Sequence, residues 1–220
     1  MIPIRDTIPR KNPPIATWFI ILANSLVFLF ELSMPEHTLV QFFYRFGLVP
    51  ARYTHPAWAL WIFGDNVEDR MGPMRFLFFY LSCGIAAGLV HWFTNPDSTI
   101  PAVGASGAIA GVMGAYLFLF PYARIIVLFP VLFIPFFFEL PAVVYLGFWA
   151  LAQLFSGTLA LASPSEVGGV AWWGHVGGFG AGMLLQFFLV RRADAFRRPS
   201  RDEYGVENAW VPASYWRNNR

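Results

Sequence analysis

The chain has 220 residues, of which 57% are hydrophobic, 19% aromatic and only 13% charged, and its formal net charge is +2 at pH 7. So few charges and so many apolar side chains exclude an ordinary water-soluble globular domain. The composition predicts an all-α fold, a polytopic bundle of membrane helices.

Four apolar runs approach the roughly 20 residues that span a bilayer, and a fifth is slightly shorter. In chain order, the five predicted helices cover residues 15–33, 75–93, 105–120, 141–162 and 171–190. Basic residues precede the first run, so a cleaved signal peptide is the alternative there, but no small-residue cleavage site follows it. The single cysteine, Cys83, excludes an intramolecular disulfide, and we expect it to pack in the core.

Lysine and arginine alternate with segments that almost lack them. Thirteen of the 15 fall in four places, which are the amino end, Arg70 with Arg75, Arg124, and the tail from Arg191 onward. Segments 94–104 and 163–171 contain neither residue. Because basic residues stay on the cytoplasmic side, we expect these two segments outside and both termini in the cytoplasm of an integral, multi-pass protein of the bacterial inner membrane.

These patterns divide the chain into a cytoplasmic N-terminal segment (1–14), a transmembrane domain (15–190) and a basic cytoplasmic tail (191–220). The tail suits either contact with anionic lipid or a solvated topological anchor. Expected partners are the lipid bilayer and transmembrane protein substrates, with no nucleic acid, no metal and no cofactor. The oligomeric state does not follow from the sequence.

The stretch 125–138, IIVLFPVLFIPFFF, resembles a further span. It has only 14 residues and contains Pro130 and Pro135, which remove backbone hydrogen bonds that a lipid-exposed helix needs. A crossing here would also place the arginine-rich tail outside. We therefore expect this stretch to dip into the membrane or to lie at its interface.

Two side chains capable of catalysis share one predicted depth. Ser106 lies in the first turn of the helix 105–120, and His175 lies in the first turns of the last helix. Glycines on both helices would allow close backbone approach. The predicted helix-packing residues are Gly104, Gly107, Gly111, Gly174, Gly178 and Gly182. We therefore expect Ser106 and His175 to meet at hydrogen-bond distance.

A histidine that accepts a serine proton is the minimal activated nucleophile. Free N–H groups in the first helical turn, including that of Ser106 itself, would stabilise an oxyanion. The structural alternative for Ser106 is a helix cap or a small packing residue, and His91 is a rival base. The G-x-S-x-G elbow of soluble hydrolases does not apply, because Ala108 replaces the last glycine and no strand is predicted before it.

The segments GASG and GHVGGFGAG, which open these two helices, resemble the signature of the rhomboid intramembrane serine proteases. The resemblance extends to GLVPARY and GDNVEDRMGPMRFLFFY, over most of residues 10–190. It implies a six-helix bundle in which Ser106 is the nucleophile and His175 the base. It also implies cleavage of transmembrane segments of other proteins near the outer surface.

The sequence departs from the family pattern at two places. Relatives carry His-x-x-x-Asn near the outer end of the second helix, where it helps to form the oxyanion hole. Here only the eight residues AWALWIFG precede Asp65, or about 12 Å of helix, so we expect a truncated second helix and an internal deletion before it. At Ala110 many relatives have an aromatic ring that stacks on the histidine.

These departures leave three classes of function to compare. An intramembrane serine endopeptidase with impaired activity is the first. A catalytically inactive rhomboid-like protein that binds transmembrane segments is the second. A small transporter would need paired midplane charges or interrupted helices in two related halves, and neither pattern is present. The reactivity of Ser106 toward a fluorophosphonate separates the first two.

Overall fold

The computed structural model describes residues 2–8, 10, 12–35, 38, 55–96, 104–131, 134–162 and 171–190. The predicted tail 191–220, His37 and most of the two predicted outer segments lie outside these residues. The helices described are α1 (Ile15–Leu32), α3 (His55–Met71), α4 (Pro73–Thr94), α5 (Ser106–Leu119), α6 (Ala142–Ala162) and α7 (Trp172–Leu189). The strands described are β1 (Ile2–Asp6), β2 (Arg124–Val131) and β3 (Ile134–Pro141).

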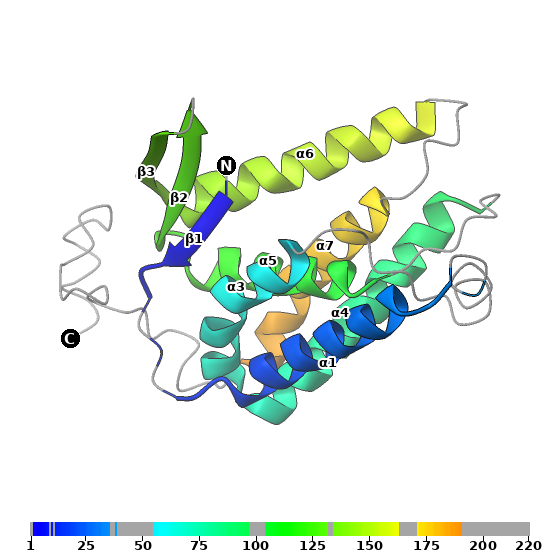
Figure 1. The fold of residues 1–220 in the computed structure, drawn as a ribbon, viewed down its shortest axis with the longest axis horizontal. Helices are drawn as coiled ribbons and strands as arrows, with labels where there is room; N and C mark the ends of the chain where they lie inside the picture. Colours follow the sequence, from blue (N-terminus) through cyan, green and yellow to red (C-terminus); the bar gives the residue numbers. More distant parts are fainter. Residues whose placement is uncertain are drawn as a thin grey trace.

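The helices form the predicted membrane bundle, with α5 running through its middle (Figure 1). Within the described part of the chain, α1, α4 and residues 142–161 of α6 are long and apolar enough to span a bilayer, while α5 is a shorter apolar helix. Their outward faces carry large apolar side chains, such as Phe148 at 72% exposure. Such faces are solvated by lipid rather than water. The protein is therefore an integral membrane protein.

The centre of the bundle is built from small side chains. In α5 every residue from Gly107 to Tyr116 is buried, including Ala110, which is 1% exposed. Cys83 on α4 is fully buried against α5, as expected for core packing. A central helix can be buried on all sides only if its neighbours approach closely, which glycine and alanine permit.

Helix α3 is longer than its apolar part. His55 and Pro56 precede the eight-residue segment AWALWIFG, which continues through DNVEDRM, so the helix has 17 residues and is about 25 Å long. This is still shorter than the roughly 20 residues of a full span. Four of these polar residues have partners in the N-terminal segment or in α1, namely Asp65, Asn66, Glu68 and Asp69, and Arg70 lies over the ring of Phe120.

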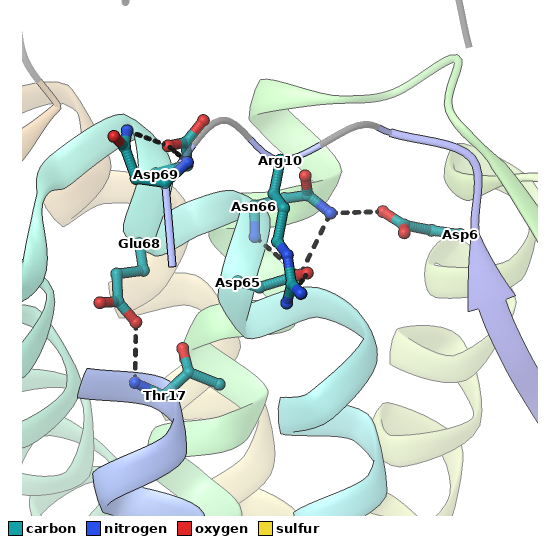
Figure 2. Close-up of polar contacts among 8 residues, drawn as sticks. Asp6, Arg10, Thr17, Asp65, Asn66, Glu68 and Asp69 are labelled. Carbon is teal, nitrogen blue, oxygen red and sulfur yellow. Dashed lines mark hydrogen bonds and ion pairs between the residues drawn. The ribbon is translucent and has the colours of Figure 1, made fainter. Parts of the chain in front are cut away.

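Figure 2 shows these polar contacts. The carboxylate of Glu68 accepts hydrogen bonds from the backbone N–H groups of Ala16 (2.9 Å) and Thr17 (2.7 Å), of which Figure 2 draws the second. Pro14, at the N-cap of α1, makes no side-chain cap bond, so Glu68 supplies the cap from another helix. A negative charge at this position also interacts favourably with the helix dipole.

The next contacts hold the amino end against α3. The side-chain amide of Asn66 donates to Asp6 (2.7 Å) and to Asp65 (3.2 Å), and Arg10 forms an ion pair with Asp65 at 3.9 Å (Figure 2). The hydroxyl of Tyr116 on α5 also donates to Asp6. The N-terminal segment is thereby joined to both α3 and α5.

The residues 125–138 belong to a three-stranded antiparallel sheet in the order β1-β2-β3, which the sequence did not lead us to expect. β2 and β3 form a hairpin in which Pro130 pairs with Pro135 near the turn, and Ile2 of β1 pairs with Leu128. The run is not a transmembrane helix, in agreement with the prediction. The hairpin lies beside β1 at one end of the bundle (Figure 1), and its location at the membrane interface stays a prediction.

Candidate functional site

Helices α5 and α7 pack more closely than side chains would allow. A Cβ atom built on Gly178 or Gly182 would collide with the backbone carbonyl of Gly107 or Gly111, respectively. Gly114, which the sequence analysis did not select, is equally close to the backbone of Phe179. A Cβ on Gly107 or Gly111 would in turn collide with Ala87 or Cys83 of α4, so all five helix positions require glycine for steric reasons.

The other predicted packing glycines have different surroundings. Gly174 would place a Cβ in ordinary contact with Ala171 at 3.4 Å, so it is less restricted than Gly178. Gly104 precedes α5 and has φ 114°, a left-handed conformation that favours glycine. Its role is to turn the chain into the first turn of α5 rather than to pack between helices.

This close packing brings the two predicted catalytic side chains together. His175 Nε2 lies 2.9 Å from Ser106 Oγ, a hydrogen-bond distance between groups 69 residues apart in sequence. Both residues are half-buried. Ser106 is the first residue of α5, and no side-chain cap bond is formed at this helix start. The hydroxyl is therefore directed to the imidazole and does not serve as a helix cap.

The second ring nitrogen of His175 also has a polar partner. His175 Nδ1 lies 2.8 Å from Oε1 of Gln153, a residue of α6 that is only 8% exposed. Gln153 is not among the residues predicted from the sequence, because it belongs neither to the serine and histidine pair nor to the family motifs. A side-chain amide in an otherwise apolar membrane helix was the available signal, since such groups are rare and usually bonded.

Two tryptophans flank the imidazole of His175. The Trp149 ring of α6 is tilted, with its centroid 6.1 Å from that of the imidazole, and the Trp172 ring stands edge-on at 6.3 Å. Ala110 supplies no ring, so the aromatic surroundings of His175 come from α6 and from α7 itself. Trp172 is the first residue of α7, three residues before His175.

The rival base has different partners. Nδ1 of His91 lies 3.3 Å from the side-chain amide nitrogen of Asn95, at the end of α4. His91 also lies close to Gly174, on the same side of the bundle as Ser106 and His175. His55 is the first residue of α3. Of the two histidines whose side chains the structure describes, only His175 contacts Ser106.

Backbone N–H groups complete the site. The N–H of Ile109 donates to Ala105, so the N–H of Ser106 precedes the regular helical hydrogen bonds of α5. It is the donor that the sequence analysis assigned to an oxyanion. The sequence contains no His-x-x-x-Asn before α3, so this chain lacks the side-chain donors that the resemblance implies for that position.

Comparisons with known proteins relate the chain to one family. A family model described as Rhomboid domain matches residues 56–192, which include Ser106, Gln153 and His175. The chain is 28% identical over 144 residues to Rhomboid protein 1, mitochondrial, of Saccharomyces cerevisiae, covering 64% of this chain and 38% of that protein.

Two further similarities are more local. The chain is 43% identical over 60 residues to Rhomboid protease GluP of Bacillus subtilis, covering 27% of this chain and 11% of that protein. It is 36% identical over 75 residues to Rhomboid-like protein 11, chloroplastic, of Arabidopsis thaliana, covering 30% and 26%. The chain thus spans less than two thirds of the length of each of these relatives. No solved structure matches it.

Proposed function

The chain belongs to the rhomboid family, and from this membership we propose that it is an intramembrane serine endopeptidase that uses a dyad of Ser106 and His175. The 2.9 Å contact between Ser106 Oγ and His175 Nε2 is the observation that carries the proposal. A serine hydroxyl is a weak nucleophile until a neighbouring base accepts its proton. No metal or cofactor takes part in this reaction.

The proposed reaction has two halves. His175 Nε2 takes the proton of Ser106 as Oγ attacks the carbonyl carbon of the substrate peptide bond. The tetrahedral intermediate collapses, the C–N bond breaks, and the imidazolium gives its proton to the leaving amine. A water molecule, deprotonated by the same imidazole, then hydrolyses the acyl-enzyme and regenerates the Ser106 hydroxyl.

The oxyanion would receive the backbone N–H of Ser106 but no His or Asn side chain from the start of α3. Removing one such donor typically lowers turnover by about 100- to 1,000-fold. Losing two costs less than the product of the two factors, because residues that act as a unit are strongly non-additive. We therefore infer that this chain is a slow protease.

The proposed substrates are transmembrane segments of other membrane proteins. Ser106 and His175 are half-buried at the starts of α5 and α7, close to the end of α4. If the basic termini lie on the cytoplasmic side of a bacterial inner membrane, this end of the bundle faces outward. Cleavage would then occur near the outer surface, where water can enter.

A fluorophosphonate probe tests the nucleophile directly. We expect the purified chain in detergent micelles to be labelled at Ser106, and labelling to be lost in Ser106→Ala and strongly reduced in His175→Ala. Thermal unfolding of each variant controls for loss of the fold. A folded wild-type chain that the probe does not label would contradict the proposed activity.

The second candidate is a catalytically inactive rhomboid-like protein that binds transmembrane segments. The missing His-x-x-x-Asn at the start of α3 favours it, because the sequence supplies no such side-chain donors at that place. This candidate predicts no fluorophosphonate labelling, together with capture of a transmembrane peptide that is unchanged in Ser106→Ala. Labelling of Ser106 in the wild type would exclude it.

A further inference from the structure

His175 uses both of its ring nitrogens, and each faces a different helix. Nε2 meets Ser106 of α5 at 2.9 Å, and Nδ1 meets Oε1 of Gln153 of α6 at 2.8 Å. The imidazole on α7 is thus held between a hydroxyl and a carboxamide oxygen. The contact with Ser106 serves the proposed reaction, whereas the proposed reaction assigns no role to the contact with Gln153.

The chemistry of the three groups determines where the protons lie. A neutral imidazole has one N–H donor and one acceptor lone pair, and an amide oxygen can only accept. The contact with Gln153 Oε1 therefore requires the proton on Nδ1. The lone pair of Nε2 then points to Ser106, which is the arrangement that a general base needs.

The opposite tautomer would be unproductive. With the proton on Nε2, the imidazole would donate a hydrogen bond to Ser106 Oγ and could not take its proton. The tryptophan rings beside His175 restrict the plane of the imidazole, but apolar faces do not distinguish one ring nitrogen from the other. Among the described residues, Gln153 is the polar group recorded at Nδ1.

The burial of Gln153 explains why an amide suits this position. The side chain is 8% exposed and belongs to a helix with large lipid-facing apolar residues such as Phe155. A buried carboxylate loses much of its hydration, whereas a neutral amide loses far less. An amide thus orients the imidazole without placing an ionised group within the bundle.

We propose that Gln153 is a positioning residue, which holds His175 in the Nδ1–H tautomer so that Nε2 can accept the proton of Ser106. This role rests on the proposed protease function. The dyad of serine and histidine that the family resemblance implies contains no such third residue. The proposed catalytic unit then consists of Ser106 on α5, His175 on α7 and the uncharged amide of Gln153 on α6.

The test compares two substitutions at one position with a matched control. Gln153→Leu keeps the approximate volume and removes the acceptor, whereas Gln153→Glu keeps an oxygen at the same place. The control is Gln186→Leu, because Gln186 is a buried glutamine of α7, about 16 Å along the helix from His175. Within the described residues its Nε2 has no hydrogen-bond partner.

Two measurements are made on each chain in micelles. The first is the rate of fluorophosphonate labelling at Ser106, which we expect to fall about 10- to 100-fold in Gln153→Leu. Gln153→Glu should retain most of the rate, and Gln186→Leu should equal the wild type. The second is the ¹⁵N NMR spectrum of histidine-labelled protein, with the His175 signals identified by their loss in His175→Ala.

The NMR measurement does not depend on catalysis. We expect an Nδ1–H imidazole in the wild type and in Gln153→Glu, and a mixture of tautomers or a predominant Nε2–H form in Gln153→Leu. An Nδ1–H imidazole that persists in Gln153→Leu would overturn the proposal. So would a Gln153→Glu chain that labels as slowly as Gln153→Leu, because the acceptor oxygen would then not be what matters.

The two proposals can fail separately. If the wild type is not labelled but its tautomer changes in Gln153→Leu, the protease function fails and the positioning contact stands. If the wild type is labelled and Gln153→Leu is labelled equally fast, the protease function stands and the positioning role fails. If Gln153→Leu does not fold, the labelling rate of Gln153→Glu and the imidazole tautomer of the wild type still test the positioning role.

Discussion

Gly178 is the residue at which packing and chemistry are most directly connected. A side chain there would collide with the carbonyl of Gly107, the residue after Ser106, so the two helix starts could not approach. We expect Gly178→Leu to abolish fluorophosphonate labelling while the chain still inserts into membranes. The matched control is Gly180→Leu on the same helix, where a Cβ has nothing within 4 Å. Unchanged labelling in Gly178→Leu would contradict this account of the site.

Glu68 holds the start of α1 by accepting two hydrogen bonds, one with each carboxylate oxygen. A side-chain amide has only one oxygen and could accept with that one alone. Glu68→Gln leaves one backbone N–H opposite an NH₂ group, so we expect a loss of about 1–3 kcal/mol in the free energy of unfolding. The control is Glu139→Gln, because Glu139 pairs with Arg124 on the exposed part of the hairpin. That pair should contribute at most about 1 kcal/mol. Equal effects in a denaturant titration would refute the capping role.

Some contacts of single residues could be predicted from the sequence, and others could not. The contact between Ser106 and His175 was predictable, because both residues open glycine-rich helices that start on the same side of the membrane. Gln153 was not, because an isolated amide in an apolar run resembles an ordinary packing residue until its partner is known. Gly114 was missed since three-residue spacing from Gly111 departs from the small-xxx-small pattern.

Among the elements, α3 limits the proposed activity. Its 17 residues begin at His55 and leave no place for the missing oxyanion donors. We expect insertion of a helical segment carrying His-x-x-x-Asn directly before α3 to raise the rate of substrate cleavage about 100-fold or more. An insertion of equal length with alanine at both positions controls for completing the span. If both insertions have the same effect, the missing donors are not what limits the rate.

The sheet shows why other elements could not be predicted. The run IIVLFPVLFIPFFF is apolar throughout, so it lacks the alternation that identifies a half-buried strand. Its partner β1 is five residues long and pairs with residues more than 100 positions away, as in the match of Ile2 with Leu128. Local patterns contain no information about such a pairing. The prolines correctly excluded a further span, but they did not indicate a hairpin.

At the scale of the whole molecule, the orientation in the membrane remains to be tested. The distribution of basic residues predicts that both termini lie in the cytoplasm and that the starts of α5 and α7 lie outside. We expect a cysteine introduced at Asp97 to react with an impermeant maleimide from the outer side only. Cys83 is fully buried and should stay unreactive in folded protein, which gives an internal control. Reaction from the cytoplasmic side alone would mean that the site faces inward.

The attachment of the amino end to α3 and α5 has a consequence for the timing of assembly. Asp6 bonds to Tyr116, which follows it by 110 residues, and β1 needs β2, which ends at Val131. A ribosome that adds about 5–20 residues per second therefore needs on the order of ten seconds between making β1 and making its partners. During that interval β1 can contact α3 but lacks its neighbouring strand and Tyr116, although Thr7 is later almost completely buried. The segment 2–7 thus leaves the ribosome well before α5 and β2 but reaches its final place only after them.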